Sequence, residues 1–376
     1  MKNIVNLGNV ATYINGYAFK PSDWAEDGTP IIRIQDLTGN SYQMNRFKGI
    51  VDSKYDVNSG DVLISWSASL GVYVWNRGNA VLNQHIFKVV FDKEEVDKDF
   101  FVFQIDNLLK RAANQAHGAT MRHLTKPVFD ALPFYLPDIK TQRLISSKLN
   151  LIVHLIEDHH EQLKKLDELI RSRFLEMFGM SEGIDKHLED VADICSGITK
   201  GRKVLGLELR EVPYMAVSNV KMGYIDLSTV KTIMATENEI EQYRLFPNDI
   251  LMTEGGDPDK VGRGAIIRNP PKDCIHQNHI FRVRLHKDVL LPEFFEEYLQ
   301  GNSARRYFLK AAKQTTGIAS INMKQLRALP VKIPPIKVQI QYSDFVHQVD
   351  KSKLAVQKSL DELETLKKSL MQTYFG

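Results

Sequence analysis

The clearest hydrophobic pattern in the chain occurs twice, once near the middle and once at the end. In each stretch, apolar residues recur at steps of three and four, which is the spacing of a heptad seam between paired helices. The first series is Leu149, Ile152, Ile156, Leu163, Leu166, Ile170 and Met177, interrupted by His159 and Arg173. The second series is Val346, Val349, Val356, Leu360, Leu363, Leu370 and Tyr374, interrupted by Lys353 and Lys367. The pattern predicts long helices over residues 144–180 and 341–376.

A nearly repeated phrase precedes each predicted helix: LPFYLPDIKTQ at 132–142 and LPVKIPPIKVQ at 329–339. Proline cannot continue a helix interior, so these segments fix where the helices begin and act as hinges to the preceding residues. Each helix would be on the order of 50 Å long. We expect the two helices to form an antiparallel coiled coil, although either stripe alone is also compatible with ordinary core packing.

The same order of segments runs through both halves of the chain, roughly 190 residues apart. The corresponding pairs are LGNVATYINGYAFK and LEDVADICSGITKG, SGDVLISW and PNDILMTE, LNQHIFKVVF and HQNHIFRVRL, and RFLEMFG and LMQTYFG. Repeats of this length are domains rather than solenoid units. The sequence therefore predicts a tandem duplication, with domains over 1–143 and 181–340 that are related by an approximate two-fold axis.

Within each predicted domain, short strand-like runs punctuated by Gly and Pro come first, and a helical stretch follows. The strand runs are TPIIRI, DVLISW, VYVW and IFKVVF in the first copy and VPYMAV, DILMT, GAIIR and IFRVRL in the second. The helical stretches are FFVFQIDNLLKRAANQA and EFFEEYLQGNSARRYFLKAAK. The expected fold class is α+β, with two mixed domains separated by two long helices.

The composition of the 376-residue chain, 43% hydrophobic and 25% charged, is that of a globular protein. No apolar run reaches the roughly 18 residues of a membrane span, and the N-terminus lacks a secretory signal. Two cysteines, Cys195 and Cys274, are too few for a disulfide framework or a four-ligand zinc site. We therefore expect a cytoplasmic protein. The net charge of +3 is compatible with a nucleic-acid partner without indicating one.

The duplicated domains, the repeated LP…P…Q hinges and the long helices ending in Phe-Gly together resemble the specificity subunit of type I restriction-modification systems. The resemblance covers essentially the whole chain. It implies that each domain is a target recognition domain that reads one half of a split DNA sequence. The paired helices would hold the halves apart and dock two methyltransferase subunits. The resemblance also implies that this chain performs no chemistry, because S-adenosylmethionine and the restriction and translocase activities belong to partner subunits.

The residues themselves also lack the signatures of a DNA methyltransferase, which needs a Gly-rich cofactor turn and an Asn-Pro-Pro-aromatic loop. Asn-Pro-Pro occurs at 269–271, but Lys272 follows it, so a proline turn is the favoured interpretation. The glycines at 255–256 and 262–264 lack the spacing of a nucleotide-binding fingerprint and indicate a loop. The adjacent histidines at 159–160 would point about 100° apart on a helix, which favours a solvated polar face over a metal site.

Candidate base-reading residues follow the Asp-led strand of each copy, where loops could present donors and acceptors beside basic groups. They are Ser65, Trp66, Ser67 and Ser69 in the first copy and Thr253, Glu254, Lys260 and Arg263 in the second. The two loops differ in chemistry while their flanking strands match. That difference is expected if one frame reads two different half-sites.

Two further places combine polar and basic residues. A turn in each copy suits a helix N-terminus facing phosphate, although Thr120 or Ser320 could be a plain helix cap. Its residues are Thr120, Arg122, His123 and Lys126 in the first copy and Thr316, Ser320, Asn322 and Lys324 in the second. The early loops supply Tyr17, Lys20, Lys200, Arg202 and Lys203. The Asn-Gln-His and Gln-Asn-His triplets at 83–85 and 277–279 are favoured as framework, because both copies share His-Ile-Phe.

Polar residues inside each seam would weaken the helix pair and leave apolar flanks for partner subunits. The candidate partner-binding residues are Leu155, Leu169 and Leu366. Two other functions remain open. A coiled-coil scaffold that binds only proteins predicts no salt-dependent duplex binding, and a fused methyltransferase predicts a chain that retains S-adenosylmethionine.

Overall fold

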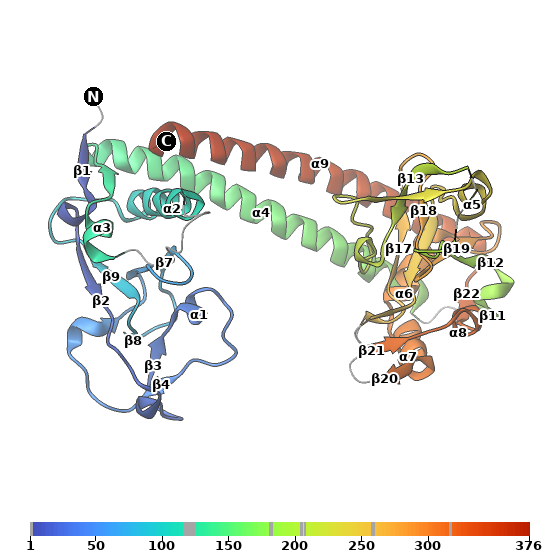
Figure 1. Cartoon of the computed structure of the whole chain (residues 1–376), viewed down its shortest axis with the longest axis horizontal. Helices are drawn as coiled ribbons and strands as arrows, with labels where there is room; N and C mark the ends of the chain where they lie inside the picture. The colour runs from blue at the N-terminus through green and yellow to red at the C-terminus, as the bar shows by residue number, and fades with distance from the viewer. Residues whose placement is uncertain are drawn as a thin grey trace. The chain divides into compact units, whose positions relative to one another are not determined.

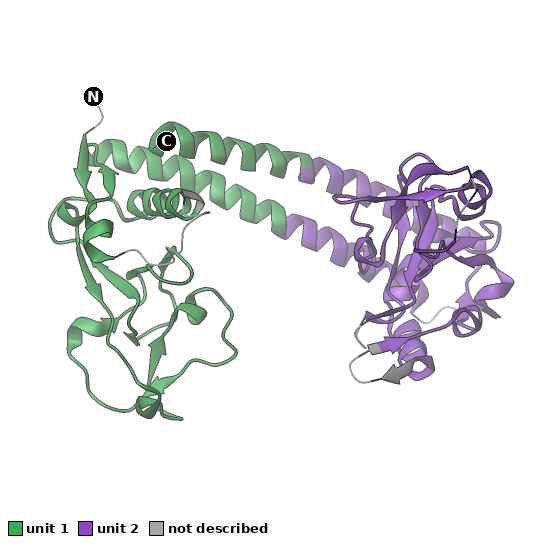
Figure 2. Ribbon diagram, in the orientation of Figure 1, with its two compact units in different colours: residues 1–160, 358–376 green, residues 161–357 purple. Residues whose placement is uncertain are grey.

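The computed structural model describes residues 3–115, 125–179, 183–203, 206, 208–256, 260–315 and 318–376. The chain divides into two compact units (Figure 2): unit 1 is residues 1–160 with 358–376, and unit 2 is residues 161–357. The long helices are α4 (Ile139–Phe178) and α9 (Ile336–Phe375). Each unit therefore combines a strand-rich body with a part of both long helices.

Unit 1 contains two four-stranded sheets and a two-stranded ribbon (Figure 1). The first sheet has the order β2 (Thr12–Asn15), β9 (Ile86–Val90), β6 (Val62–Ser65) and β7 (Gly71–Val74). The second has the order β4 (Arg46–Phe47), β3 (Thr29–Ile32), β8 (Ala80–Leu82) and β5 (Asp56–Val57). The ribbon pairs β1 (Ile4–Asn6) with β10 (Pro133–Tyr135). The short helices are α1 (Ile34–Leu37), α2 (Lys98–Gln115) and α3 (Lys126–Asp130).

Unit 2 has a corresponding set of sheets and one more. The four-stranded sheet has the order β12 (Ala192–Ser196), β19 (Ile280–Leu285), β15 (Asp249–Thr253) and β17 (Gly264–Ile267). A second sheet has the order β14 (Lys231–Ala235), β13 (Arg210–Met215) and β18 (Ile275–His276), and a ribbon pairs β11 (Ile184–His187) with β22 (Pro330–Ile333). The additional sheet has the order β16 (Gly255–Gly256), β21 (Ile318–Ser320) and β20 (Lys313–Thr315). The short helices are α5 (Glu237–Tyr243), α6 (Pro292–Gln300), α7 (Asn302–Ala311) and α8 (Met323–Arg327).

The predicted duplication and the α+β fold class are confirmed by this topology. The order β2-β9-β6-β7 corresponds to β12-β19-β15-β17, and the registered parallel pairs, β3 with β8 and β13 with β18, occur at matching places. All the predicted strand runs lie on strands. The helical stretch 293–313 is not one helix, however, because Gly301 adopts an extended backbone between α6 and α7.

One glycine in each copy occupies the point where two sheets cross. The amides of Tyr17 and Ile198 donate to the carbonyls of Leu82 and His276, both at 2.8 Å. The residue before each amide is glycine, and a Cβ there would lie 2.1 Å from the Asn83 carbonyl oxygen at Gly16 and 1.9 Å from that of His276 at Gly197. Real Cβ atoms do not approach backbone so closely, and only glycine fits. This close approach explains why Gly16 and Gly197 recur at the same place in the repeat.

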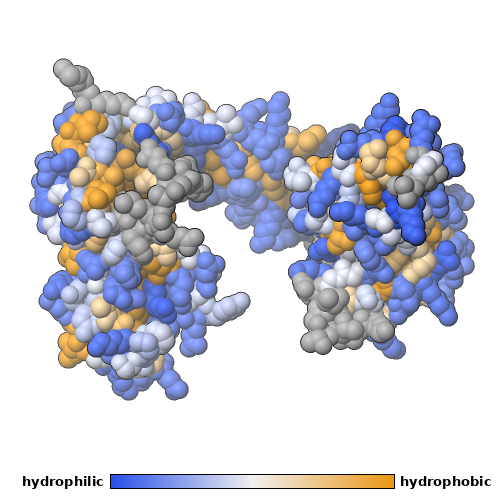
Figure 3. Space-filling model, in the orientation of Figure 1, coloured by the Kyte–Doolittle hydropathy of each residue, from blue (hydrophilic) through white to orange (hydrophobic). Residues whose placement is uncertain are grey.

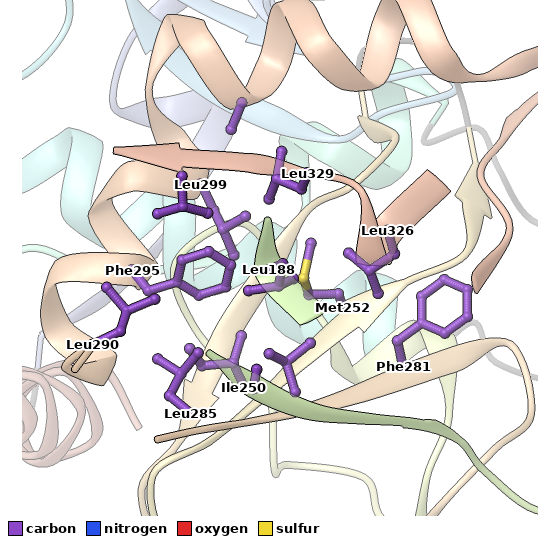
Figure 4. Close-up of a cluster of buried hydrophobic side chains, with 14 of the residues drawn as sticks. Leu188, Ile250, Met252, Phe281, Leu285, Leu290, Phe295, Leu299, Leu326 and Leu329 are labelled. Carbon is purple, nitrogen blue, oxygen red and sulfur yellow. The ribbon is translucent and has the colours of Figure 1, made fainter. Parts of the chain in front are cut away.

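A large apolar core fills unit 2 between its four-stranded sheet and α6 (Figure 4). Ile250, Met252 and Phe281 project from the sheet, and Phe295 and Leu299 meet them from α6. The corresponding core of unit 1 contains Phe100 and Phe101, which stand where Phe294 and Phe295 stand in unit 2. Burial of one such ring contributes about 1.5–3 kcal/mol relative to exposure. The apolar positions that the repeat shares are thus the positions that the two cores need.

The glutamine at the end of each hinge phrase attaches the strand-rich body to its long helix. In unit 2, Gln339 is fully buried, accepts from the Leu291 amide at 2.9 Å and donates to the carbonyls of Val289 and Pro334. In unit 1, Gln142 makes the same three kinds of bond, to the Asp97 amide and to the carbonyls of Glu95 and Pro137. Buried amide groups of this kind must be paired. The repeated glutamine therefore has a structural role in each unit: it joins the strand-rich body to the start of the long helix.

The heptad prediction is confirmed, because every seam residue of both helices is buried or half-buried. Within unit 1, His159 Nε2 of α4 lies 3.0 Å from Ser359 Oγ of α9, and Phe375 packs on Phe100. Within unit 2, Lys353 of α9 pairs with Asp167 of α4 at 2.6 Å. The start of α4 is thus near the end of α9 in unit 1 and the reverse holds in unit 2, so the helices are antiparallel.

The predicted helix bounds of 144 and 341 were wrong at the N-terminal ends, which are Ile139 and Ile336. Asp138 follows Pro137 directly and caps α4, because its carboxylate accepts from the Thr141 amide at 3.0 Å. In α9 the Pro335 carbonyl accepts the first intrahelical bond from Val338 at 2.9 Å. Thus α9 begins directly after its last proline, and α4 begins one residue after its last proline, with Asp138 as the cap.

The surface of both units is mostly hydrophilic in the view of Figure 3, with hydrophobic side chains exposed between hydrophilic ones along the long helices. None of the helices in the described part of the chain is both long and apolar enough to cross a bilayer.

Candidate nucleic-acid interface

The loop that follows β6 is held by its own side chains. Ser65 and Ser67 are buried, and the Ser65 hydroxyl donates to the Ser69 carbonyl, so these two serines shape the loop rather than face outward. The Trp66 indole N–H donates to Asn15 at 3.1 Å, and its ring stacks on Phe87 at 5.6 Å. Of the four residues predicted here, only Ser69 is fully exposed.

The corresponding loop of unit 2 has a different chemistry. Thr253 is buried with its hydroxyl unpaired, while Glu254 is partly exposed and its carboxylate lies 2.6 Å from His279 Nδ1. Arg263 donates its amide to the Lys260 carbonyl, and its Nε is buried without a partner. The glycines at 255–256 form β16, which pairs with β21, so the predicted loop is in fact a strand. An acidic and a basic side chain thus occupy the place where unit 1 has hydroxyls and an indole.

The triplets at 83–85 and 277–279 act through their backbone. The Asn83 and Gln277 amides donate to Ile32 and Met215, and the Gln84 and Asn278 amides donate to Tyr17 and Ile198. These bonds join the two sheets of each unit at the glycine crossing. The geometry supports the framework interpretation of the triplets.

The early loops contribute exposed lysines, but their arginine is already paired. Arg202 makes a bidentate contact with Glu239 and donates to the Met234 carbonyl at 3.0 Å. Hydrogen bonding from Arg202 lowers the pKa of Glu239 to about 2. Lys20, Lys200 and Lys203 are exposed and have no ion pair among the residues that the structure describes. Tyr17 is also exposed and contacts Phe19 and Tyr55 edge to face.

The predicted turn divides into pieces with separate roles. Lys126 begins α3 and pairs with Asp130 at 2.7 Å. Ser320 lies in β21, so it is not the helix cap; Asn322 caps α8 by accepting from the Gln325 amide at 2.9 Å. Lys324 is exposed on α8. Thr120, Arg122, His123 and Thr316 lie outside the described residues.

Four cations on α7 and α8, Arg305, Arg306, Lys310 and Arg327, were missed by the sequence interpretation, which named only Lys324 there. Ala304 and Phe308 bury one side of α7, and the Tyr307 hydroxyl donates to the Gln325 carbonyl of α8 at 2.8 Å. The basic side chains of both helices are all exposed and have no ion pair within the described ranges. We call them the α7–α8 cations: Arg305, Arg306, Lys310, Lys324 and Arg327. The signal was available, because no Asp or Glu occurs between Tyr298 and Ser343.

The corresponding helix of unit 1 does not present its charges in this way. Lys110 of α2 pairs with Asp106 at 2.7 Å, and Arg111 donates to the Phe375 carbonyl at the C-terminal end of α9. That carbonyl end carries partial negative charge, which Arg111 offsets. The described part of α2 therefore has no matching set of unpaired cations.

The motifs that could suggest catalysis have structural roles. The Asn-Pro-Pro segment is a turn before β18, in which the Cys274 amide donates to the Pro271 carbonyl at 3.1 Å. His159 is half-buried in the helix seam beside Ser359, and His160 is exposed. No group of three or more His, Cys, Asp or Glu residues in the described ranges is arranged to hold a metal ion.

A comparison with protein families matches the model described as type I restriction modification DNA specificity domain to residues 2–168 and again to residues 182–365. The chain belongs to the type I restriction-modification specificity family. The two matches coincide with the two copies of the repeat, which agrees with the resemblance inferred from the hinge phrases and the long helices.

Curated relatives and solved structures extend over the whole chain. The EcoBI and EcoKI specificity subunits of Escherichia coli are 22% and 21% identical, cover 99% of this chain and are themselves covered to 85% and 88%. The S subunit of M. genitalium superposes with a TM-score of 0.56 at 14% identity, covering 100% of this chain and 96% of its own. A chain from a study of assembly and conformational transition of the type I restriction-modification system gives 0.59 at 15% identity, covering 99% and 97%. At these identities the structures establish the fold. Membership of a specificity-subunit family implies a non-catalytic role.

The leucines predicted to meet partners differ in exposure. Leu169 and Leu366 are about half exposed, whereas Leu155 is half-buried. Other apolar side chains of the long helices, which the sequence interpretation missed, are more exposed: Leu144, Leu151, Leu175 and Leu354. Exposed leucines at intervals along a helix pair are a common basis for docking other helices.

Proposed function

We propose that this chain is the DNA sequence-recognition subunit of a type I restriction-modification complex and reads a split target, one half with each unit. The observation that carries the proposal is that the two copies share their structural residues but differ in the loops after the matching strands β6 and β15. Gly16 and Gly197, and Gln142 and Gln339, perform the same structural tasks in both copies. The loops after β6 and β15 differ in charge and shape, as two readers of different half-sites should.

Within this proposal the base-reading groups are those that remain accessible at the two loops. In unit 1 they are Ser69, the edge of Trp66 and the nearby Tyr17. In unit 2 they are Glu254, which could accept from a cytosine amino group, and Arg263, which could donate to guanine. Lys20, Lys200, Lys203 and the α7–α8 cations would contact phosphates and fix the register.

The partners in this proposal are double-stranded DNA and two methyltransferase subunits that dock on the long helices. Restriction and translocase subunits would join through that complex. S-adenosylmethionine would be bound by the methyltransferase subunits, and this chain would hold no cofactor and carry out no bond-making step.

The phosphate-contact assignment predicts a change in salt dependence. Arg306 and Lys310 lie four residues apart on the same side of α7. Replacing both by alanine, in the chain with its partners, should lower the slope of log K against log salt concentration by about 2 and weaken all duplexes alike. Fluorescence anisotropy over a salt series measures this slope.

The matched control is Lys110→Ala on the corresponding helix of unit 1, whose ammonium pairs with Asp106. It should leave the slope unchanged. If the α7 variant keeps the wild-type slope, the α7–α8 cations do not contact DNA. If the wild-type complex shows no salt-dependent duplex binding at all, the protein-only scaffold is the better account of the whole chain.

A further inference from the structure

Unit 2 contains a cleft of about 740 Å³ where α6 and the turn at 221–224 meet the long helices. The residues that line it include exposed apolar side chains, which are Met222, Tyr224 and, at 73% exposed, Leu354 of α9. Acidic residues outnumber basic ones in the lining: Glu293, Glu296 and Glu297 of α6 with Asp167, Glu168 and Asp350, against Arg171, Arg268 and Lys353. A cleft that combines exposed apolar side chains with excess negative charge is a candidate binding surface.

Most of the carboxylates in the cleft have cationic or amide partners. Glu296 accepts from the Ile266 amide at 2.8 Å and pairs with Arg268 at 3.2 Å. Glu293 lies 3.1 Å from His347, and Asp350 lies 3.4 Å from Arg268. These contacts join α6, β17 and the residue that follows β17 to α9, and they give three of the carboxylates hydrogen-bond or ion-pair partners.

Glu297 is the exception. The only hydrogen bond to its carboxylate within the described residues is from the Gln300 amide at 3.4 Å, and no cation lies within ion-pair distance. Burial raises the pKa of Glu297, and Arg171 opposes the shift only from longer range. A partly buried carboxylate without a close cation is costly, and a bound cation would remove that cost.

Tyr342 provides a second unsatisfied group in the same cleft. Its side chain is fully buried, and its hydroxyl has no hydrogen-bond partner. The rings of Phe174 and Phe178, each 5.5 Å away, hold it in place. Burial, together with Glu297 and Glu296, raises the pKa of Tyr342, so the phenol stays protonated and its oxygen can accept from a donor.

The first copy shows that the fold does not need these polar groups. In the repeat, Glu296 and Glu297 align with Val102 and Phe103, and Tyr342 aligns with Ile145. All three counterparts pack with the apolar core of unit 1. Only Glu293 has an acidic counterpart in unit 1, which is Asp99. The same frame is thus built in unit 1 without the charges of Glu296 and Glu297, so folding alone does not account for these two groups in unit 2.

We propose that the cleft of unit 2 binds an arginine side chain of a partner protein, between Glu297 and the Tyr342 hydroxyl. A planar guanidinium offers several donors in fixed directions, which suits one carboxylate and one hydroxyl oxygen together. Met222, Tyr224 and Leu354 would pack on the neighbouring residues of the partner. A metal ion fits less well, since no three-carboxylate group suited to a metal occurs among the described residues.

The identity of the partner rests on the proposed function, under which it is the methyltransferase subunit. Because unit 1 has Phe103 and Ile145 in the places of Glu297 and Tyr342, two identical partner copies would meet two unequal docking sites. The copy that docks on unit 2 would be held by the buried ion pair, and the copy on unit 1 would lack that ion pair.

The test compares Glu297→Gln with wild type in the full-length chain, titrated with the methyltransferase subunit by calorimetry. Removing one member of a buried charge pair should weaken one of the two binding events by about 10- to 100-fold and leave the other unchanged. Tyr342→Phe, which keeps the ring packing, should weaken the same event by a smaller factor. Glu364→Gln removes an exposed charge from α9 outside the cleft and should change neither event.

The outcomes separate the two proposals. If the methyltransferase does not bind the wild-type chain, the proposed function fails. If it binds wild type and both cleft variants equally, the arginine site is refuted while the proposed function stands. Binding of spermidine or Mg²⁺ that depends on Glu297, or self-association of the chain that depends on it, without an effect on the methyltransferase, would likewise overturn the inference.

Discussion

Replacing Gly197 by alanine is expected to destabilise unit 2 by about 3 kcal/mol or more. The added Cβ would lie 1.9 Å from the His276 carbonyl oxygen, at the point where the Ile198 amide donates to that same carbonyl. Backbone would have to move on both sides of the crossing, and the four-stranded sheet that contains β12 and β15 would shift with it. Differential scanning calorimetry of the full chain measures the loss.

The matched control is Gly256→Ala in the same unit. A Cβ at Gly256 meets only Lys260 Cβ at 3.8 Å, which is ordinary contact, and the backbone there is not in the left-handed region. This variant should melt close to wild type. A Gly197→Ala chain with wild-type stability would show that the crossing is looser than the structure indicates.

Inserting seven residues into both α4 and α9 is expected to lengthen the preferred gap between half-sites by about three base pairs. The insertions belong after His160 and before Lys358, at the boundary of the two units in each helix. Seven residues preserve the heptad phase and add about 10 Å to each helix, and each base pair of duplex spans about 3.4 Å. Selection of bound duplexes with the assembled complex measures the gap.

An insertion in α4 alone is the control for this experiment. It would put the seam residues of the two helices out of register and should lower stability rather than move the gap cleanly. If the double insertion folds and binds but keeps the wild-type gap, the helices do not set the spacing.

The domain architecture of this protein could be predicted from the sequence because the same order of segments occurs twice in the chain. The same structural features recur at matching places in both copies: the seam residues, the hinge prolines, Gly16 with Gly197 and Gln142 with Gln339. A feature that recurs in this way indicates a structural requirement shared by both domains. The helix starts were misplaced because the cap residue Asp138, directly after Pro137, was overlooked. The break at Gly301 was missed because the apolar periodicity continues across it.

The candidate interface was harder to predict because it depends on partners distant in sequence. Ser65, Ser67 and Thr253 are polar residues at strand ends, where polarity suggests exposure, yet they are buried. Arg202 is paired by Glu239, which lies 37 residues later in the chain on α5, and no local sequence pattern reveals that contact. The α7–α8 cations were visible as a stretch without acidic residues, and only the fold shows that their side chains reach solvent.

Selection of duplexes from a random pool by the chain assembled with its methyltransferase partner, followed by sequencing, shows directly whether each unit reads its own half-site. We expect two short conserved motifs separated by a gap of fixed length and variable sequence. Exchanging the loop at 253–263 should then change one motif and leave the other intact. Recovery of a single continuous motif, or of sequences without any preference, would contradict the claim that each unit reads its own half of a split target.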